Sequence, residues 1–158
     1  MLEIFNDEFF MKQALIEAQK ALDKNEVPVG AVVVLNNRVI ARTHNLTEQL
    51  TDVTAHAEVQ AITAAAQYLG AKYLKGCTMY VSLEPCSHFG KTPPCANLIV
   101  DSGIKNVVIG VIDANNKVSG NGVKYLQNNG CNVKVGVFEE AVPTSLSLAS
   151  SSLSSSSS

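Results

Sequence analysis

The sequence has no run of apolar residues long enough to cross a membrane, and its start lacks the basic region and apolar stretch of a secretory leader. These two absences predict a cytoplasmic protein without a membrane partner. Basic residues are not in excess either, because the formal net charge is −2 and no basic stripe stands out. Nucleic-acid-binding proteins usually carry such a stripe, so the composition provides no general electrostatic attraction for polyanions.

Cysteine is scarce, with four residues in a chain of 158, which fits a reducing compartment. Cys77 and Cys131 lie in strand-like runs, and we expect them to serve packing. A composition of 46% hydrophobic and 16% charged residues is typical of a globular domain. From Pro143 onward serine dominates, so we expect a folded domain over residues 1–142 and a disordered Ser-rich tail over 143–158.

Apolar patterning predicts alternating strands and helices. Strands are predicted over 29–35, 38–43, 77–83, 106–112 and 131–137, and helices from a cap at Asn6 or Asp7 to Lys24 and over 55–68, 95–102 and 123–129. The Asn36-Asn37 turn makes the first two strands a hairpin. From Cys77 the alternation implies parallel strands with helices on both faces. The predicted fold class is therefore α/β, a three-layer α/β/α sandwich with a five-stranded mixed sheet. On the first helix, the charged side chains of Lys12, Glu17, Lys20 and Asp23 are expected on a solvated side.

Two short stretches carry the chemistry, His56-Ala57-Glu58 and the segment from Glu84-Pro85-Cys86 to Pro93-Pro94-Cys95. One imidazole and two thiolates, from His56, Cys86 and Cys95, suit Zn²⁺ and leave its fourth tetrahedral position open. An open position marks a catalytic zinc, which lowers the pKa of a bound water. Glu58 supplies a carboxylate that can shuttle protons. Each piece alone is weak evidence, because single histidines and buried cysteines often serve packing only.

The combination follows the His-x-Glu and Pro-Cys-x-x-Cys pattern of zinc base deaminases, with eight residues instead of two between Cys86 and Cys95. Residues two apart do not share a helix face, so His56 and Glu58 can both reach a metal only from a helix's first turn. Thr54 as the N-cap would place them there. Pro93-Pro94 predicts that a second helix begins at Cys95, where the helix dipole favours a thiolate.

These residues resemble the cytidine deaminase-like superfamily, over essentially all of Phe9 to Glu140, and the two halves resemble different branches. Residues 9–82 resemble bacterial tRNA-specific adenosine deaminases, through Val27–Ala31, His44-Asn45 and Asp52–Glu58. Residues 83–140 resemble the deaminase domain of the bifunctional riboflavin-biosynthesis protein, through Glu84–Ala96, Val118–Gly122 and Gly136–Glu140. A natural or engineered chimera is one interpretation.

Both branches imply the same chemistry, in which zinc is held by His56, Cys86 and Cys95 while Glu58 moves protons. The exocyclic amine of a nucleobase, nucleoside or nucleotide-like substrate is replaced by a carbonyl, and ammonia leaves. Backbone amides near Ala57 and Cys86 are expected to help polarise water and substrate. Members of both branches are oligomeric, so the resemblance also implies a homodimer.

The substrate differs between the branches. In the adenosine branch, the residue matching Asn45 contacts the target nucleoside of a tRNA anticodon loop, and Val27-Pro28 lines the base pocket. In the riboflavin branch, the residue matching Lys91 helps hold the ribosyl phosphate, and His88 lies in the same loop. Ordinary alternatives stay open: a turn former at Asn45, a solvated lysine at Lys91 and a loop residue at His88.

The adenosine type is favoured, because the expected pocket residues come mostly from the first half. The alternative is the diaminohydroxyphosphoribosylaminopyrimidine deaminase step of riboflavin synthesis. A hypothesis of another class is a non-catalytic, zinc-stabilised binding module, against which Glu58 argues, since a purely structural site needs no carboxylate there.

Overall fold

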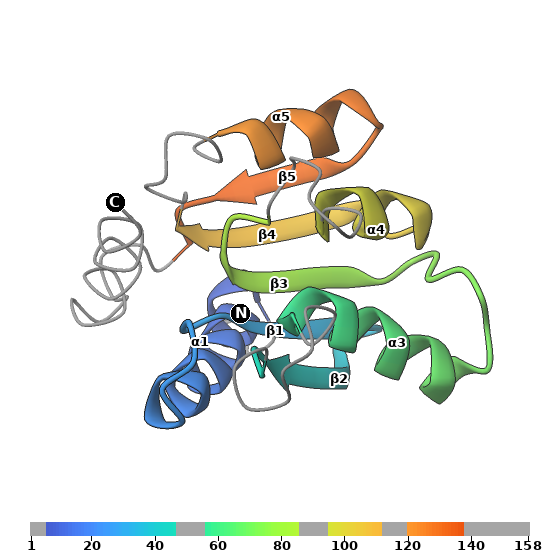
Figure 1. Ribbon diagram of the computed structural model, residues 1–158. Coiled ribbons are helices and arrows are strands. Elements are labelled where there is room, and N and C mark those ends of the chain that lie inside the picture. Colours follow the sequence, from blue (N-terminus) through green and yellow to red (C-terminus); the bar gives the residue numbers. More distant parts are fainter. Residues whose placement is uncertain (1–5, 47–55, 86–94, 112–119, 138–158) are drawn as a thin grey trace, which may run out of the picture.

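The computed structural model describes residues 6–46, 56–85, 95–111 and 120–137. In this part, four helices alternate with five strands (Figure 1). In chain order they are α1 (Asp7–Asp23), β1 (Gly30–Leu35), β2 (Arg38–His44), α3 (Ala57–Leu69), β3 (Thr78–Leu83), α4 (Cys95–Asp101), β4 (Asn106–Val111), α5 (Asn121–Asn128) and β5 (Asn132–Val135).

The five strands form one mixed sheet in the order β2-β1-β3-β4-β5, visible from bottom to top in Figure 1. Strand β1 is antiparallel to both β2 and β3, whereas β3, β4 and β5 run parallel to one another. The hairpin turns at Asn36 and Asn37, whose positive φ angles of 51° and 61° suit asparagine in a tight turn. The predicted mixed sheet with an antiparallel hairpin is therefore confirmed.

Helices cover both faces of the sheet, which confirms the three layers. Helix α1 packs on one face, where Phe10, Met11 and Ala14 meet Val32 and Tyr80. The other face carries α3, α4 and α5. Both crossover helices, α4 and α5, lie on this same face because the strand order advances in one direction from β3 to β5, and each parallel crossover keeps the same hand.

Close packing of α1 against β1 depends on Gly30. A Cβ at this position would lie 2.1 Å from the carbonyl oxygen of Ala14 and 2.5 Å from the amide nitrogen of Ala18. The Gly30 amide donates to Ser82 Oγ at 2.9 Å instead of pairing with a strand carbonyl. Backbone pairing between β1 and β3 starts only at Ala31, so the chain before Gly30 is not paired with β3.

The described elements differ from the predicted ones mainly at their ends. Helix α5 begins at Asn121, two residues before the predicted start, because its backbone amides find an acceptor in Glu84. Cys77 and Cys131 are buried, as expected, and burial raises the pKa of both thiols. Among the described helices, none is long and apolar enough to cross a membrane. The predicted Ser-rich tail, 143–158, lies outside the described residues.

Candidate active site

Three predicted functional side chains meet between α3 and α4. His56, Glu58 and Cys95 each offer a ligand atom, and these atoms all lie within 4.8 Å of one another. Glu58 and Cys95 are buried, while His56 is partly exposed. Ala57 of α3 and Ala96 of α4, the sequence neighbours of these residues, belong to the main hydrophobic core, so the packing of both helices holds the cluster in place.

The start of α3 explains how residues two apart reach one point. His56 is the N-cap, with extended backbone angles of φ −67° and ψ 146°, and Glu58 lies in the first helical turn. Both residues therefore lie at the start of the helix, as predicted, but the N-cap assignment to Thr54 is wrong. The helix begins at Ala57, two residues later than predicted. The imidazole of His56 therefore projects from extended backbone and not from the helix.

The donor set fits a zinc ion. An imidazole nitrogen and a thiolate sulfur are common zinc ligands, and a carboxylate beside them can act as a ligand or as a proton carrier. Cys95, the cysteine of this cluster, is the first residue of α4. The remaining predicted ligand, Cys86, lies outside the described residues, as do His88 and Lys91.

The chain that leads to Cys86 is anchored by Glu84, a buried residue that follows β3. Its carboxylate accepts hydrogen bonds from the backbone amides of Gly120 at 2.9 Å and Val123 at 3.1 Å. It therefore caps α5, whose own N-cap, Gly120, offers no side chain. Gly122 packs so closely that a Cβ there would lie 2.1 Å from the Pro85 carbonyl oxygen. These contacts fix the position of Pro85, which is the last described residue before Cys86.

The predicted substrate residues gather at the same end of β1 and β2. Asn45 and Pro28 are buried and Val27 is partly buried. The backbone amide of Asn45 donates to the Val29 carbonyl oxygen at 3.0 Å, so the two segments expected to line a base pocket are adjacent. Ala57 is buried as well, and its carbonyl oxygen accepts a hydrogen bond from Thr43 Oγ1 at 2.6 Å.

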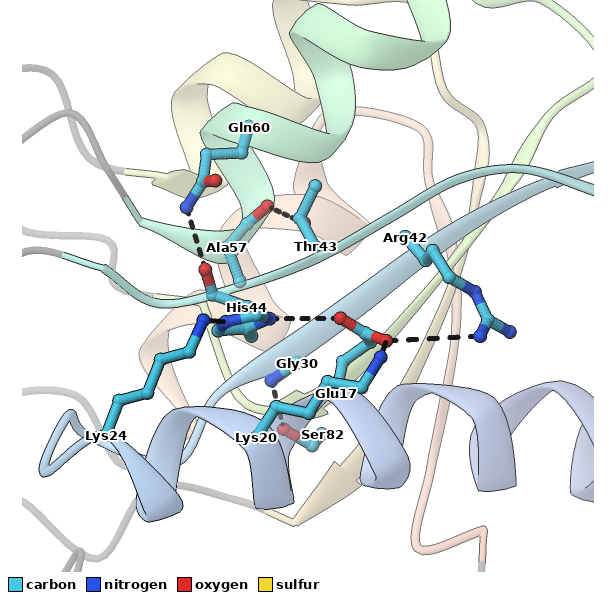
Figure 2. A network of polar contacts seen from close by, with 10 residues as sticks. All are labelled: Glu17, Lys20, Lys24, Gly30, Arg42, Thr43, His44, Ala57, Gln60 and Ser82. Carbon is cyan, nitrogen blue, oxygen red and sulfur yellow. Dashed lines mark hydrogen bonds and ion pairs between the residues drawn. The ribbon is translucent and has the colours of Figure 1, made fainter.

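A polar network beside this end of the sheet was missed by sequence reasoning (Figure 2). Glu17 was expected on the solvated side of α1, but this expectation is wrong, because only 3% of the residue is exposed. Its carboxylate accepts from Lys20 Nζ at 2.8 Å and lies 3.0 Å from His44 Nδ1. The signal was present in the sequence: Glu17 stands three residues after Ala14 and four before Ala21, on the buried face of α1.

The ionisation of Glu17 reflects these contacts. Burial by itself disfavours the charged carboxylate, but hydrogen bonds from Lys20 and His44 outweigh it and lower the pKa of Glu17 below its ordinary value. The side chain is therefore held as a carboxylate between α1 and β2.

The structure places a histidine and a glutamate at the start of α3 and a cysteine at the start of α4, with both helices packed on one mixed sheet. This is the arrangement of a metal-assisted deaminase. The chain belongs to the family described as "Cytidine and deoxycytidylate deaminase zinc-binding region", whose model matches residues 5–111. It is therefore an enzyme of the deaminase class, a hydrolase that acts on carbon–nitrogen bonds, and the family is zinc-binding.

Two kinds of relative match the chain equally well. The tRNA-specific adenosine deaminase of Bacillus subtilis is 44% identical over 138 residues, covering 85% of this chain and 82% of that protein. The diaminohydroxyphosphoribosylamino-pyrimidine deaminase of Buchnera aphidicola (subsp. Acyrthosiphon pisum) is also 44% identical over 138 residues, covering 85% of this chain and 87% of the relative. The resemblance to both branches is thus confirmed.

A solved structure shows the same fold. The crystal structure of a diaminohydroxyphosphoribosylaminopyrimidine deaminase/5-amino-6-(5-phosphoribosylamino)uracil reductase from Thermotoga maritima superposes with a TM-score of 0.72 at 45% identity. The match covers 89% of this chain but only 38% of the Thermotoga chain. The chain therefore spans well under half the length of that bifunctional relative.

Proposed function

We propose that the protein is a zinc-dependent hydrolytic deaminase of the adenosine-to-inosine type. The observation that carries the proposal is the convergence of His56, Glu58 and Cys95, whose ligand atoms lie within 4.8 Å of one another. The reaction adds water to the ring carbon that bears an exocyclic amine, releases ammonia, and leaves a carbonyl in its place.

Each residue has a defined role in this reaction. His56 and Cys95, with Cys86 as the third ligand, would hold the zinc, which when bound activates a water for attack on the ring carbon. Glu58 takes a proton from the attacking water and delivers a proton to the departing amine. Its burial keeps bulk water away from the carboxylate, so the proton passes between water and substrate along a short path.

The adenosine type is supported by the arrangement of residues around Asn45. The segments 27–29 and 43–45, which resemble the pocket of adenosine deaminases, are joined by the hydrogen bond between Asn45 and Val29. Segment 43–45 is also bonded to the first turns of α3, through Thr43 to Ala57 and through the His44 carbonyl oxygen to Gln60 Nε2 at 2.8 Å. A planar base placed beside Asn45 would therefore lie next to the helix that carries Glu58.

A second candidate is the aminopyrimidine deaminase step of riboflavin synthesis. The Buchnera relative, matched over 87% of its length, carries this name without the length of a bifunctional protein. The residues 84–96 of this chain resemble that branch, with Lys91 as a phosphate clamp and His88 beside it. We propose this reaction as the alternative.

Ammonia release separates the two reactions. Purified protein loaded with zinc is incubated with a tRNA anticodon stem-loop, free adenosine, free guanine, and the riboflavin aminopyrimidine phosphate. The proposal predicts turnover of the adenosine-containing substrates, with Lys91→Ala harmless. Turnover of the aminopyrimidine alone, abolished by Lys91→Ala, would replace it by the second candidate. Stoichiometric zinc without turnover of any substrate would instead favour a zinc-stabilised binding module. The implied homodimer is checked by light scattering on the same samples.

A further inference from the structure

His44 lies at the end of β2 with both of its ring nitrogens in polar contacts (Figure 2). Nδ1 is 3.0 Å from Glu17 Oε1, and Nε2 is 3.0 Å from the ammonium group of Lys24. Both partners come from α1 and the residue that ends it. The imidazole therefore connects β2 to α1 on the side of the sheet opposite α3.

The chemistry of the two partners fixes the tautomer. An ammonium group can only donate hydrogen bonds, so Nε2 of His44 must accept the bond from Lys24. The proton of a neutral imidazole is then on Nδ1, from which it is donated to the Glu17 carboxylate. Two cations lie near this carboxylate, Lys20 at 2.8 Å and Arg42 at 4.0 Å, so the buried charge of Glu17 is compensated.

The backbone around His44 contacts two parts of the proposed site, the first turns of α3 and the segment before β1. The preceding residue, Thr43, bonds the carbonyl oxygen of Ala57, which lies between His56 and Glu58. The His44 carbonyl oxygen accepts from Gln60 of α3, and the amide of the following residue, Asn45, donates to Val29. A shift of the His44 ring would therefore move both Asn45 and the start of α3.

We propose that Glu17 and His44 are positioning residues of the enzyme, which fix residues 43–45 against the first turn of α3 and so set where the substrate ring meets Glu58. The inference rests on the proposed function, because Asn45 is a substrate contact only there. Neither side chain needs to touch the substrate; both act through the backbone of residues 43–45.

Steady-state kinetics of three variants test the role. His44→Phe keeps an aromatic ring but loses both polar contacts, and should lower kcat/KM by at least about tenfold, mainly through KM. His44→Asn keeps a donor at the δ position toward Glu17 and should recover most of this loss. Zinc content should equal that of the wild type in both variants. Lys20→Ala is the matched control, because it removes another bond to the same carboxylate without touching residues 43–45.

Should His44→Phe fail to fold, Glu17→Met removes the acceptor with a side chain of similar length and should raise KM in the same way. The double variant Glu17→Met/His44→Phe should be no worse than the more impaired single variant, since both changes break the same contact between Glu17 and His44. Unchanged KM in His44→Phe or Glu17→Met would overturn the inference. So would a loss of activity that follows zinc loss in proportion, or a His44→Asn variant as impaired as His44→Phe.

A readout without catalysis keeps this test separate from that of the proposed function. If the wild-type protein deaminates none of the substrates, the proposed function fails, and amide hydrogen exchange decides the structural role. The backbone amide of Gln60 donates to the His56 carbonyl oxygen at 3.0 Å. This backbone amide should exchange at least about tenfold faster in His44→Phe than in Lys20→Ala. Equal exchange in the two variants would overturn the role of His44 in holding α3.

Discussion

His56 and Glu58 are separated by one residue, yet ligand atoms of both lie within 4.8 Å of each other and of a ligand atom of Cys95. This is geometrically allowed because His56 is still extended while Glu58 has entered the first turn of α3. The boundary between extended chain and helix therefore creates the site.

Replacement of the Glu58 carboxylate by an amide tests catalysis separately from metal binding. Glu58→Gln should keep zinc and lower kcat by about 10²- to 10⁴-fold, because the amide cannot accept and return a proton. Metal analysis and ammonia release on the same sample measure both effects. Asp101→Asn, at the exposed end of α4, is the control and should match the wild type. Undiminished activity in Glu58→Gln would remove this residue from the mechanism.

Thiol replacements test which cysteine binds metal. Cys95→Ser should lower zinc affinity by at least about tenfold, because the hydroxyl is a far weaker zinc ligand than a thiolate. Cys131→Ser should keep zinc, since Cys131 is buried elsewhere and its thiol donates to the Ile104 carbonyl oxygen, a bond that serine can also make. Equal zinc affinity in the two variants, measured by competition with a chelator, would exclude Cys95 as a ligand.

The cap of α5 is expected to stabilise the fold. Glu84→Ala leaves the amides of Gly120 and Val123 without their acceptor and should lower the free energy of unfolding by about 2–3 kcal/mol. Glu84→Gln keeps one acceptor oxygen and should fall between this variant and the wild type. Lys124→Ala, exposed on the same helix, should change stability by less than about 0.5 kcal/mol. Denaturant unfolding in which Glu84→Ala matches Lys124→Ala would contradict the capping role.

Acid should weaken the contact of Asp7, at the start of α1, with Tyr80 of β3 and Lys134 of β5. Asp7 is partly buried, which opposes its ionisation, but hydrogen bonds from Lys134 and Tyr80 lower its pKa below the ordinary 3.8. A carboxyl whose folded-state pKa is depressed contributes stability above its unfolded pKa and loses it as pH falls through the folded value. Asp7→Asn should therefore cost roughly 0.5–1 kcal/mol at pH 7 and progressively less below about pH 4. A pH-independent difference in unfolding free energy would contradict this assignment.

The architecture could be predicted because its signals are local. Continuous apolar runs marked β1 and β4, Asn36-Asn37 marked the hairpin turn, and alternation after Cys77 implied parallel pairing. The convergence of His56, Glu58 and Cys95 could be predicted because the residue types and their spacing restrict the chemistry that they can perform.

The partners of Glu17 and Glu84 could not be predicted from the sequence, because most of them come from distant parts of the chain. The carboxylate of Glu17 is buried only because His44, 27 residues away, and Lys20 compensate it. The start of α5 differs from the predicted one for a similar reason, because Glu84 accepts hydrogen bonds from backbone amides that lie 36 and 39 residues away in the sequence. Tertiary partners of this kind override local patterns of charge and helix propensity.

Anomalous diffraction at the zinc absorption edge, on crystals of the wild-type protein grown with zinc, tests the central claim most directly. The account predicts one anomalous peak per chain, about 2.0–2.1 Å from a ring nitrogen of His56 and about 2.3 Å from Cys95 Sγ. A map without a peak between these two side chains, or with its zinc bound elsewhere, would contradict it.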